Sequence, residues 1–259
     1  MPTMIMQQTS TIARYTLLEA LRNRLVWLIV TAACAGIGLS GFVNELALTE
    51  NHDVQLALLA AFLRCAAVFL IATFVVTSMV REANDKGLEL LLALPLPRSG
   101  YLFGKMAGFA ALALIVAGVF GLLTALLALP LQSLLWTLSL VAECWVMVLF
   151  CMLCVLTFNQ VLPALSAAAA FYLVARSITA LQLIGNQPGH DASASQEVIR
   201  VMVECLSAVL PHLDAFTKTE WLVYGTGSWH ALGLLGAQAL IYLLLLCGAA
   251  LFDLYRKNI

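Results

Sequence analysis

The sequence predicts an all-α integral membrane protein with six transmembrane helices, an N-terminal amphipathic interfacial helix and a short cytoplasmic coupling helix. Composition is the first reason: of the 259 residues, 63% are hydrophobic and only 10% are charged. Soluble domains, in contrast, are roughly half apolar and a quarter charged. The mean hydropathy of the chain is +0.98. Segment length is the second reason, since several apolar stretches exceed the roughly 20 residues that cross about 30 Å of hydrocarbon. The net charge of −1 gives no reason to expect a nucleic-acid partner.

The whole chain, 1–259, is expected to form a single transmembrane domain. Residues 9–24 are expected to form the interfacial helix, because apolar residues recur there at helical spacing between basic ones. Pro130, Gln132 and Ser133 are expected to form a tight turn between two spans. The six spans are expected at about residues 25–43, 54–80, 102–129, 134–158, 161–184 and 231–252.

The distribution of basic residues predicts the orientation. With six spans and a cytoplasmic N-terminus, the C-terminus is also cytoplasmic, and most of the 13 Lys and Arg residues fall on the cytoplasmic side. Residues 185–230 then form the outer segment, which a capping-box pattern and two distinct faces predict to contain an amphipathic helix. The basic residues assigned to the cytoplasmic side are Arg14, Arg22, Arg24, Arg81, Lys86, Arg98, Lys105, Arg256 and Lys257.

The sequence offers no metal site that we would predict. The pairs His52-Asp53, His190-Asp191 and His212-Leu-Asp214 fall in separate loops and lack ligand-type spacing. Cys151 and Cys154 form a CxxC pattern, but it lies inside an apolar span without a neighbouring His or basic residue. These thiols are therefore interpreted as packing groups.

The loop after the second span is the most informative segment. Residues 81–100 combine charged residues with a Leu-rich run, which Gly87 can start and Pro95 can stop. Such a helix just outside the membrane is a contact surface for a soluble partner, although a plain interfacial connector fits the same pattern. The residues expected to contact the partner are Arg81, Glu82, Asp85, Lys86, Gly87, Glu89, Pro95 and Arg98.

The order of these residues resembles the signature of ABC-2 superfamily exporter permeases. The resemblance starts with Arg81-Glu82, continues through Lys86-Gly87-Leu-Glu89 and Pro95-Leu-Pro-Arg98, and ends in Gly104-Lys105 at the third span. The entry helix, the six spans, the Leu210-Pro-His-Leu-Asp-Ala-Phe216 stretch and the basic C-terminus extend it over essentially the whole chain.

The resemblance implies a permease that pairs with a second copy of itself and with two copies of a cytoplasmic ABC ATPase. ATP and Mg²⁺ would bind in that partner, while this chain would hold no cofactor. The sequence agrees, because Gly104-Lys105 is followed by Met106 where a P-loop needs Ser or Thr. The resemblance further implies the bacterial cytoplasmic (inner) membrane as the location and leaves room for a periplasmic accessory protein.

Apart from Lys105 near the start of the third span, three charged residues fall within the predicted spans: Arg64, Glu143 and Arg176. A charge in hydrocarbon is costly, so these residues are expected to pair with one another or to face a cavity. One interpretation is a structural ion pair between Glu143 and one of the two arginines. The other is a polar patch that lines the path of an anionic or amphipathic substrate.

Two other classes of protein are weighed against the exporter. An intramembrane enzyme would need a nucleophile with a base or paired carboxylates at one depth, and Ser166 and Ser177 have no intramembrane His beside them. A membrane scaffold or assembly factor explains the spans but leaves the charged loop without a role. Within the exporter interpretation, the substrate stays open.

Overall fold

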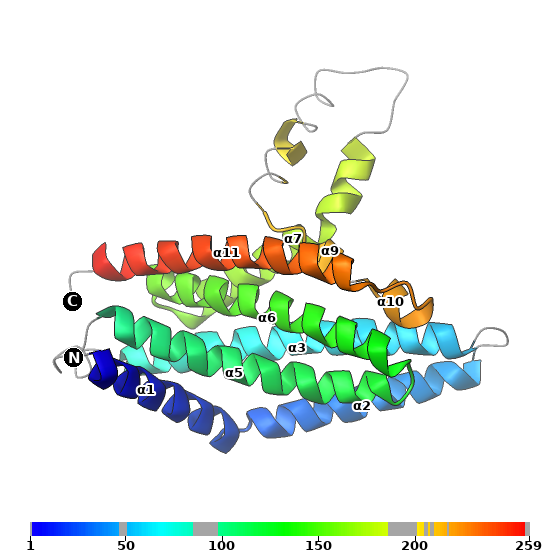
Figure 1. Ribbon diagram of the computed structural model, residues 1–259, viewed down its shortest axis with the longest axis horizontal. Helices are drawn as coiled ribbons and strands as arrows, with labels where there is room; N and C mark the ends of the chain where they lie inside the picture. Colours follow the sequence, from blue (N-terminus) through cyan, green and yellow to red (C-terminus); the bar gives the residue numbers. More distant parts are fainter. Residues whose placement is uncertain are drawn as a thin grey trace.

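The computed structural model describes residues 2–46, 51–84, 98–185, 201–204, 207, 210–216 and 218–256. Within these ranges the regular elements are helices, without a strand. Six of the helices are long and apolar enough to cross a membrane (Figure 1). The predicted all-α membrane fold with six spans is confirmed.

The six spanning helices alternate in direction, and they share one bundle axis except for the later part of α7, which turns away from the other spans (Figure 1). Helix α1 (Pro2–Arg22) precedes them, and the short helices α9 (Leu213–Phe216) and α10 (Glu220–Val223) come before the last. Helix α1 and the end of the last span lie at the same end of the bundle, as an even number of spans requires. The spanning helices are α2 (Leu25–Leu46), α3 (Asn51–Asn84), α5 (Arg98–Ala125), α6 (Pro130–Phe158), α7 (Val161–Gly185) and α11 (Trp229–Arg256).

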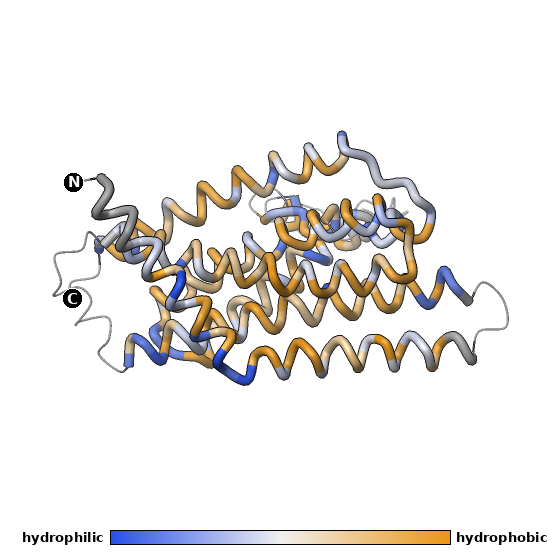
Figure 2. The backbone as a smooth tube through the Cα atoms, turned by 60° about the horizontal axis from the view of Figure 1, so that its bottom comes forward, coloured by the Kyte–Doolittle hydropathy of each residue, from blue (hydrophilic) through white to orange (hydrophobic). Residues whose placement is uncertain are grey.

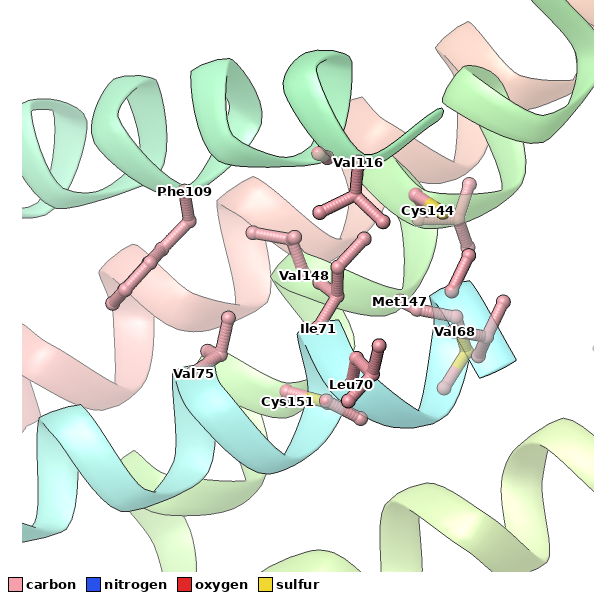
Figure 3. Close-up of a cluster of buried hydrophobic side chains, with 14 of the residues drawn as sticks. Val68, Leu70, Ile71, Val75, Phe109, Val116, Cys144, Met147, Val148 and Cys151 are labelled. Carbon is pink, nitrogen blue, oxygen red and sulfur yellow. The ribbon is translucent and has the colours of Figure 1, made fainter. Parts of the chain in front are cut away.

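Helices α3 and α6 form the centre of the bundle, and α2, α7 and α11 are mostly exposed. Figure 2 shows hydrophobic residues along the length of the spans and hydrophilic residues gathered near their ends. In the core, Ile71 and Val75 of α3 meet Phe109 and Val116 of α5 and Val148 of α6 (Figure 3). Exposed apolar faces around a packed core are what a lipid-embedded bundle presents.

The cysteines of α6 are part of this core. Cys144 and Cys151 are fully buried and Cys154 nearly so, and all three are free thiols. Figure 3 shows Cys144 and Cys151 among the apolar side chains. This placement agrees with a packing role for small, polarisable side chains.

Helix α1 packs closely against the first half of α5. Two glycines of α5 permit the approach: a Cβ atom at Gly104 would lie 2.9 Å from Cβ of Ile12, and one at Gly108 would lie 2.7 Å from Cβ of Thr16. Small residues four apart are a usual way for membrane helices to bring their backbones together. Helix α1 is therefore held by protein on one side, while Tyr15 and Leu18 are exposed.

The turn between α5 and α6 lies earlier than the sequence analysis expected. Pro130 is at the start of α6, not in the turn, and Gln132 and Ser133 belong to the same helix. Proline suits the first helical position because its missing N–H would have no partner there. The Ser133 hydroxyl then lies 2.8 Å from that of Thr124, across the turn.

Several predicted features lie partly outside the described residues. Of the predicted coupling segment, the structure describes 81–84 and 98–100. Of the amphipathic helix expected within the outer segment, it describes 201–204, which are helical, and 207. The fifth predicted span, 161–184, agrees with α7.

Candidate functional site

Two buried polar clusters are candidates for function, and the first contains Arg64 of α3. Its Nη1 atom lies 2.7 Å from Oε2 of Glu143 on α6. The side chains are 2% and 0% exposed, so the pair is fully enclosed by protein. The Nη2 atom donates to the Ser139 hydroxyl at 2.8 Å, and the guanidinium carbon lies 5.0 Å from the Trp136 ring centroid.

The same arginine fastens the outer segment to the spans. Its Nη1 atom also donates to the backbone carbonyl of Phe216 in α9, at 2.7 Å. Farther along, the Gln132 side chain donates to the carbonyl of Gly225 at 2.9 Å and accepts from the N–H of Gly227 at 3.1 Å. Arg64 and Gln132 thus hold the chain on both sides of α10 against α3 and α6.

Arg176 of α7 makes no direct contact with Glu143, although its partner Tyr172 also interacts with the Glu143 carboxylate. Its Nη1 atom donates to the Tyr172 hydroxyl at 2.6 Å and lies 3.5 Å from Sγ of Cys65. The Glu143 charge acts on Arg176 as well, but the direct ion pair of Glu143 is with Arg64. Of the two partners that the sequence analysis left open for Glu143, the structure has Arg64 in contact.

The second cluster joins α1, α3 and α5 at the end of the bundle where the chain begins. We call it the α1–α3–α5 cluster, and it consists of Glu19, Ser78, Glu82, Tyr101 and Lys105. The Nζ atom of Lys105 lies 2.6 Å from Oε2 of Glu82, and the Ser78 hydroxyl donates to Glu19 at 3.0 Å. Tyr101 is buried between them, and both carboxylates act on it electrostatically.

This cluster lies at the base of the predicted coupling segment. Arg81 and Glu82 occupy the last turn of α3, and Arg98 begins α5. The other predicted partner-contacting residues, Asp85, Lys86, Gly87, Glu89 and Pro95, lie outside the described residues. The contact joins the last turn of α3 to α5, and the Lys105 and Glu82 side chains are 7% and 18% exposed.

Sequence reasoning assigned Glu82 to partner docking and did not foresee its contact with Lys105. The signal was nevertheless present. Helices α3 and α5 are antiparallel, and only residues 85–97 lie between them in sequence, so residues a turn or two from the end of one and the start of the other face one another. Opposite charges at such positions predict an ion pair.

The two serines weighed in the sequence analysis, Ser166 and Ser177, contact backbone carbonyls of their own helix. Ser166 donates to the carbonyl of Pro163 and Ser177 to that of Leu173, so each bonds to its own helix. Such back-bonding is the usual state of Ser in apolar helices. Within the described ranges there is also no group of three or more His, Cys, Asp or Glu side chains that could hold a metal ion.

Comparison with known proteins agrees with the six-span membrane fold. Residues 20–186 match the model of the ABC-2 family transporter protein family, which is more than half of the chain. No curated protein matches the chain. The matched region includes five of the six spans, the predicted coupling segment, and both polar clusters apart from Glu19 and the Phe216 carbonyl. The chain therefore belongs to the ABC-2 family of transporter proteins, as the permease of an ABC-type transporter whose family works with an ABC ATPase.

Proposed function

We propose that this permease is an exporter subunit of the bacterial cytoplasmic membrane, which moves its substrate outward with ATP that a separate cytoplasmic ATPase hydrolyses. The functional unit contains two permease copies and two ATPase copies. An accessory protein on the outer side would meet the 185–230 segment. This chain itself hydrolyses no nucleotide: Lys105 lacks the following Ser or Thr of a P-loop, and its ammonium group is paired with Glu82.

The observation that carries the proposal is the α1–α3–α5 cluster. The chain joins residues 85–97 directly to α3 and α5, and the Glu82–Lys105 contact links these two helices to each other. A force applied to residues 85–97 would therefore move both helices together. Helix α1 follows, since it packs against Gly104 and Gly108 of α5. Three helices are thereby mechanically joined at one end of the bundle, which is the arrangement that an ATPase contact needs to move spans together.

The charges of the described residues support a cytoplasmic location for this end. Basic side chains gather at the end where α1 begins and α11 finishes, and positively charged loops stay on the cytoplasmic side. At the opposite end, the described basic residue is Lys218, accompanied by Asp53, Asp214 and Glu220. The described basic residues of the first end are Arg14, Arg22, Arg24, Arg81, Arg98, Lys105 and Arg256.

Orientation is tested by single-cysteine labelling on a cysteine-free background. Cysteines replacing Leu90 and Asn258 should resist a membrane-impermeant thiol reagent added outside, whereas one replacing Ser195 should react. Labelling of position 90 from outside intact cells would show that the orientation is the opposite one, and the proposal of outward transport would lose its basis.

Coupling is tested with a charge reversal in the loop. Glu89→Arg should leave a membrane-inserted permease that no longer copurifies with the ATPase, or no longer supports its substrate-stimulated hydrolysis, because interface charges set register and partner choice. The matched control is Glu220→Arg, an exposed acid-to-base change in α10 at the other end of the bundle. Unchanged copurification and hydrolysis in Glu89→Arg would exclude this segment as the coupling site.

A further inference from the structure

We propose that Arg176, together with Tyr172, forms a binding site within the membrane-spanning region for the anionic group of an amphipathic molecule, such as a phosphate, sulfate or carboxylate head. The inference deepens the proposed export function and rests on it in naming the class of substrate. The site itself is argued from charge, depth and exposure.

The charges in the spans do not cancel. Arg64 and Arg176 supply two cations, and Glu143 supplies one carboxylate that is in direct contact with Arg64. Arg176 bonds to two neutral groups, the Tyr172 hydroxyl and the Cys65 thiol. In the described part of the chain, no carboxylate oxygen lies within 4.0 Å of its guanidinium. Glu143 also acts on Arg176 at longer range, but one carboxylate does not balance two guanidinium groups. An anion from outside the protein would supply the missing charge.

Depth argues against an arginine that merely extends to the outer interface. Arg176 precedes the end of α7 at Gly185 by nine residues, or roughly 13 Å of helix. Its guanidinium turns back toward Tyr172, one turn nearer the start of α7 and therefore farther from the outer end. A snorkelling side chain would extend the other way, toward the nearest headgroups. The charge is held at depth, where such groups usually face a cavity or a ligand.

Exposure separates Arg176 from Arg64. Arg64 is 1% exposed, whereas Arg176 is partly exposed and Cys65 beside it is exposed. Both described hydrogen bonds of Arg176 use Nη1, so Nη2 and Nε can make the paired contacts that guanidinium forms with phosphate or carboxylate. The Tyr172 hydroxyl fixes the orientation of the Arg176 side chain.

Cys65 provides a reporter for this site. In a variant with Cys34, Cys205 and Cys247 replaced by Ser, Cys65 is the exposed thiol, because Cys144, Cys151 and Cys154 are buried. The purified permease in phosphatidylcholine nanodiscs is labelled with anionic sulfonatoethyl methanethiosulfonate and, separately, with the cationic trimethylammonioethyl reagent. The ratio of the two rates measures the local charge, because any effect on the thiol itself acts on both reagents.

Arg176→Gln should lower the anionic-to-cationic rate ratio at Cys65 about tenfold. A unit charge about 6 Å away, screened as in water, speeds one reagent about threefold and slows the other by as much. Arg176→Lys should keep most of the preference. Size-exclusion chromatography confirms that each variant stays folded. The matched control keeps Cys34, exposed on α2, in place of Cys65, and its ratio should not respond to Arg176→Gln.

Competition distinguishes the source of the anion. Dodecyl phosphate should slow labelling of Cys65 by both reagents and leave Cys34 unaffected, while dodecyltrimethylammonium should not protect. If nanodiscs containing phosphatidylglycerol protect equally well, the occupant is a lipid headgroup; protection by the soluble amphiphile alone identifies a cargo site.

Two results would overturn the proposal. One is a Cys65 that reacts with neutral N-ethylmaleimide but with neither charged reagent, which would place it against lipid. The other is a rate ratio that Arg176→Gln leaves unchanged. Neither measurement involves the ATPase. A negative labelling result at Cys65 therefore does not affect the coupling test with Glu89→Arg, and a negative coupling test does not affect the proposed Arg176 site.

Discussion

Neutralising Glu143 is the sharpest test of the buried ion pair. Glu143→Gln keeps the shape of the side chain but removes the negative charge that lies 2.7 Å from Arg64. Removing one partner from a buried pair costs about 3–5 kcal/mol. Arg64 keeps its bonds to the Ser139 hydroxyl and the Phe216 carbonyl, so we expect the lower end, about 3 kcal/mol. For a chain of this size, that is roughly a 6–12 °C fall in the melting temperature.

The buried thiols of α6 make the measurement direct. A dye that becomes fluorescent on reaction with thiols reports unfolding as Cys144, Cys151 and Cys154 become accessible, in the background that lacks the exposed cysteines. The double change Arg64→Met with Glu143→Leu should recover about half of the loss, since apolar residues can replace a buried pair. Full recovery is not expected, because the Phe216 carbonyl would lose its donor.

Arg176→Gln is the matched control for the loss of an intramembrane charge. The Arg176 side chain bonds to neutral groups, so we expect its replacement to change the free energy of unfolding by no more than about 1 kcal/mol. A melting temperature for Glu143→Gln within about 2 °C of the parent protein would refute the reasoning. So would a double variant as unstable as the single one.

Two further predictions concern the α1 end of the bundle. Gly108→Ala should destabilise the protein by about 1–3 kcal/mol, because the new Cβ would lie 2.7 Å from Cβ of Thr16. The control is Gly118→Ala on the same helix, whose new Cβ meets nothing within 4 Å and which should be neutral or stabilising in the same thermal assay. Lys105→Met should lower both the melting temperature and ATPase copurification by leaving Glu82 unpaired, and the exchanged pair Glu82→Lys with Lys105→Glu should restore much of both. A swap no better than the single change would mean that the contact between these residues does not carry the effect.

The six spans were predictable because each needs only length and apolar composition, which are local properties of the sequence. The start of α6 was not, because Pro130 suits a turn and a first helical position equally well. The packing of α1 on α5 also escaped prediction: it depends on Gly104 and Gly108 meeting Ile12 and Thr16, about 90 residues earlier in the chain by their numbering.

The candidate site was predictable to the extent that burial of charge is costly. Arg64, Glu143 and Arg176 were identified because hydrocarbon requires a reason for each charge. Which arginine contacts Glu143 depends on helix rotation and tilt, and composition does not fix these. The contact between Glu82 and Lys105 was missed because each residue was assigned to a different feature, Glu82 to the loop and Lys105 to the start of a span.

The Arg64–Glu143 contact has a consequence for biosynthesis. The two residues are 79 positions apart, so at about 5–20 residues per second Arg64 is made roughly 4–16 s before its counter-ion. During that interval α3 carries an arginine whose insertion is unfavourable by about 2.5–3.5 kcal/mol at mid-membrane. The Phe216 carbonyl arrives later still, 152 residues after Arg64. Nascent chains that stop before α6 keep this arginine without its counter-ion, and we expect membrane proteases to degrade them faster than the full-length permease.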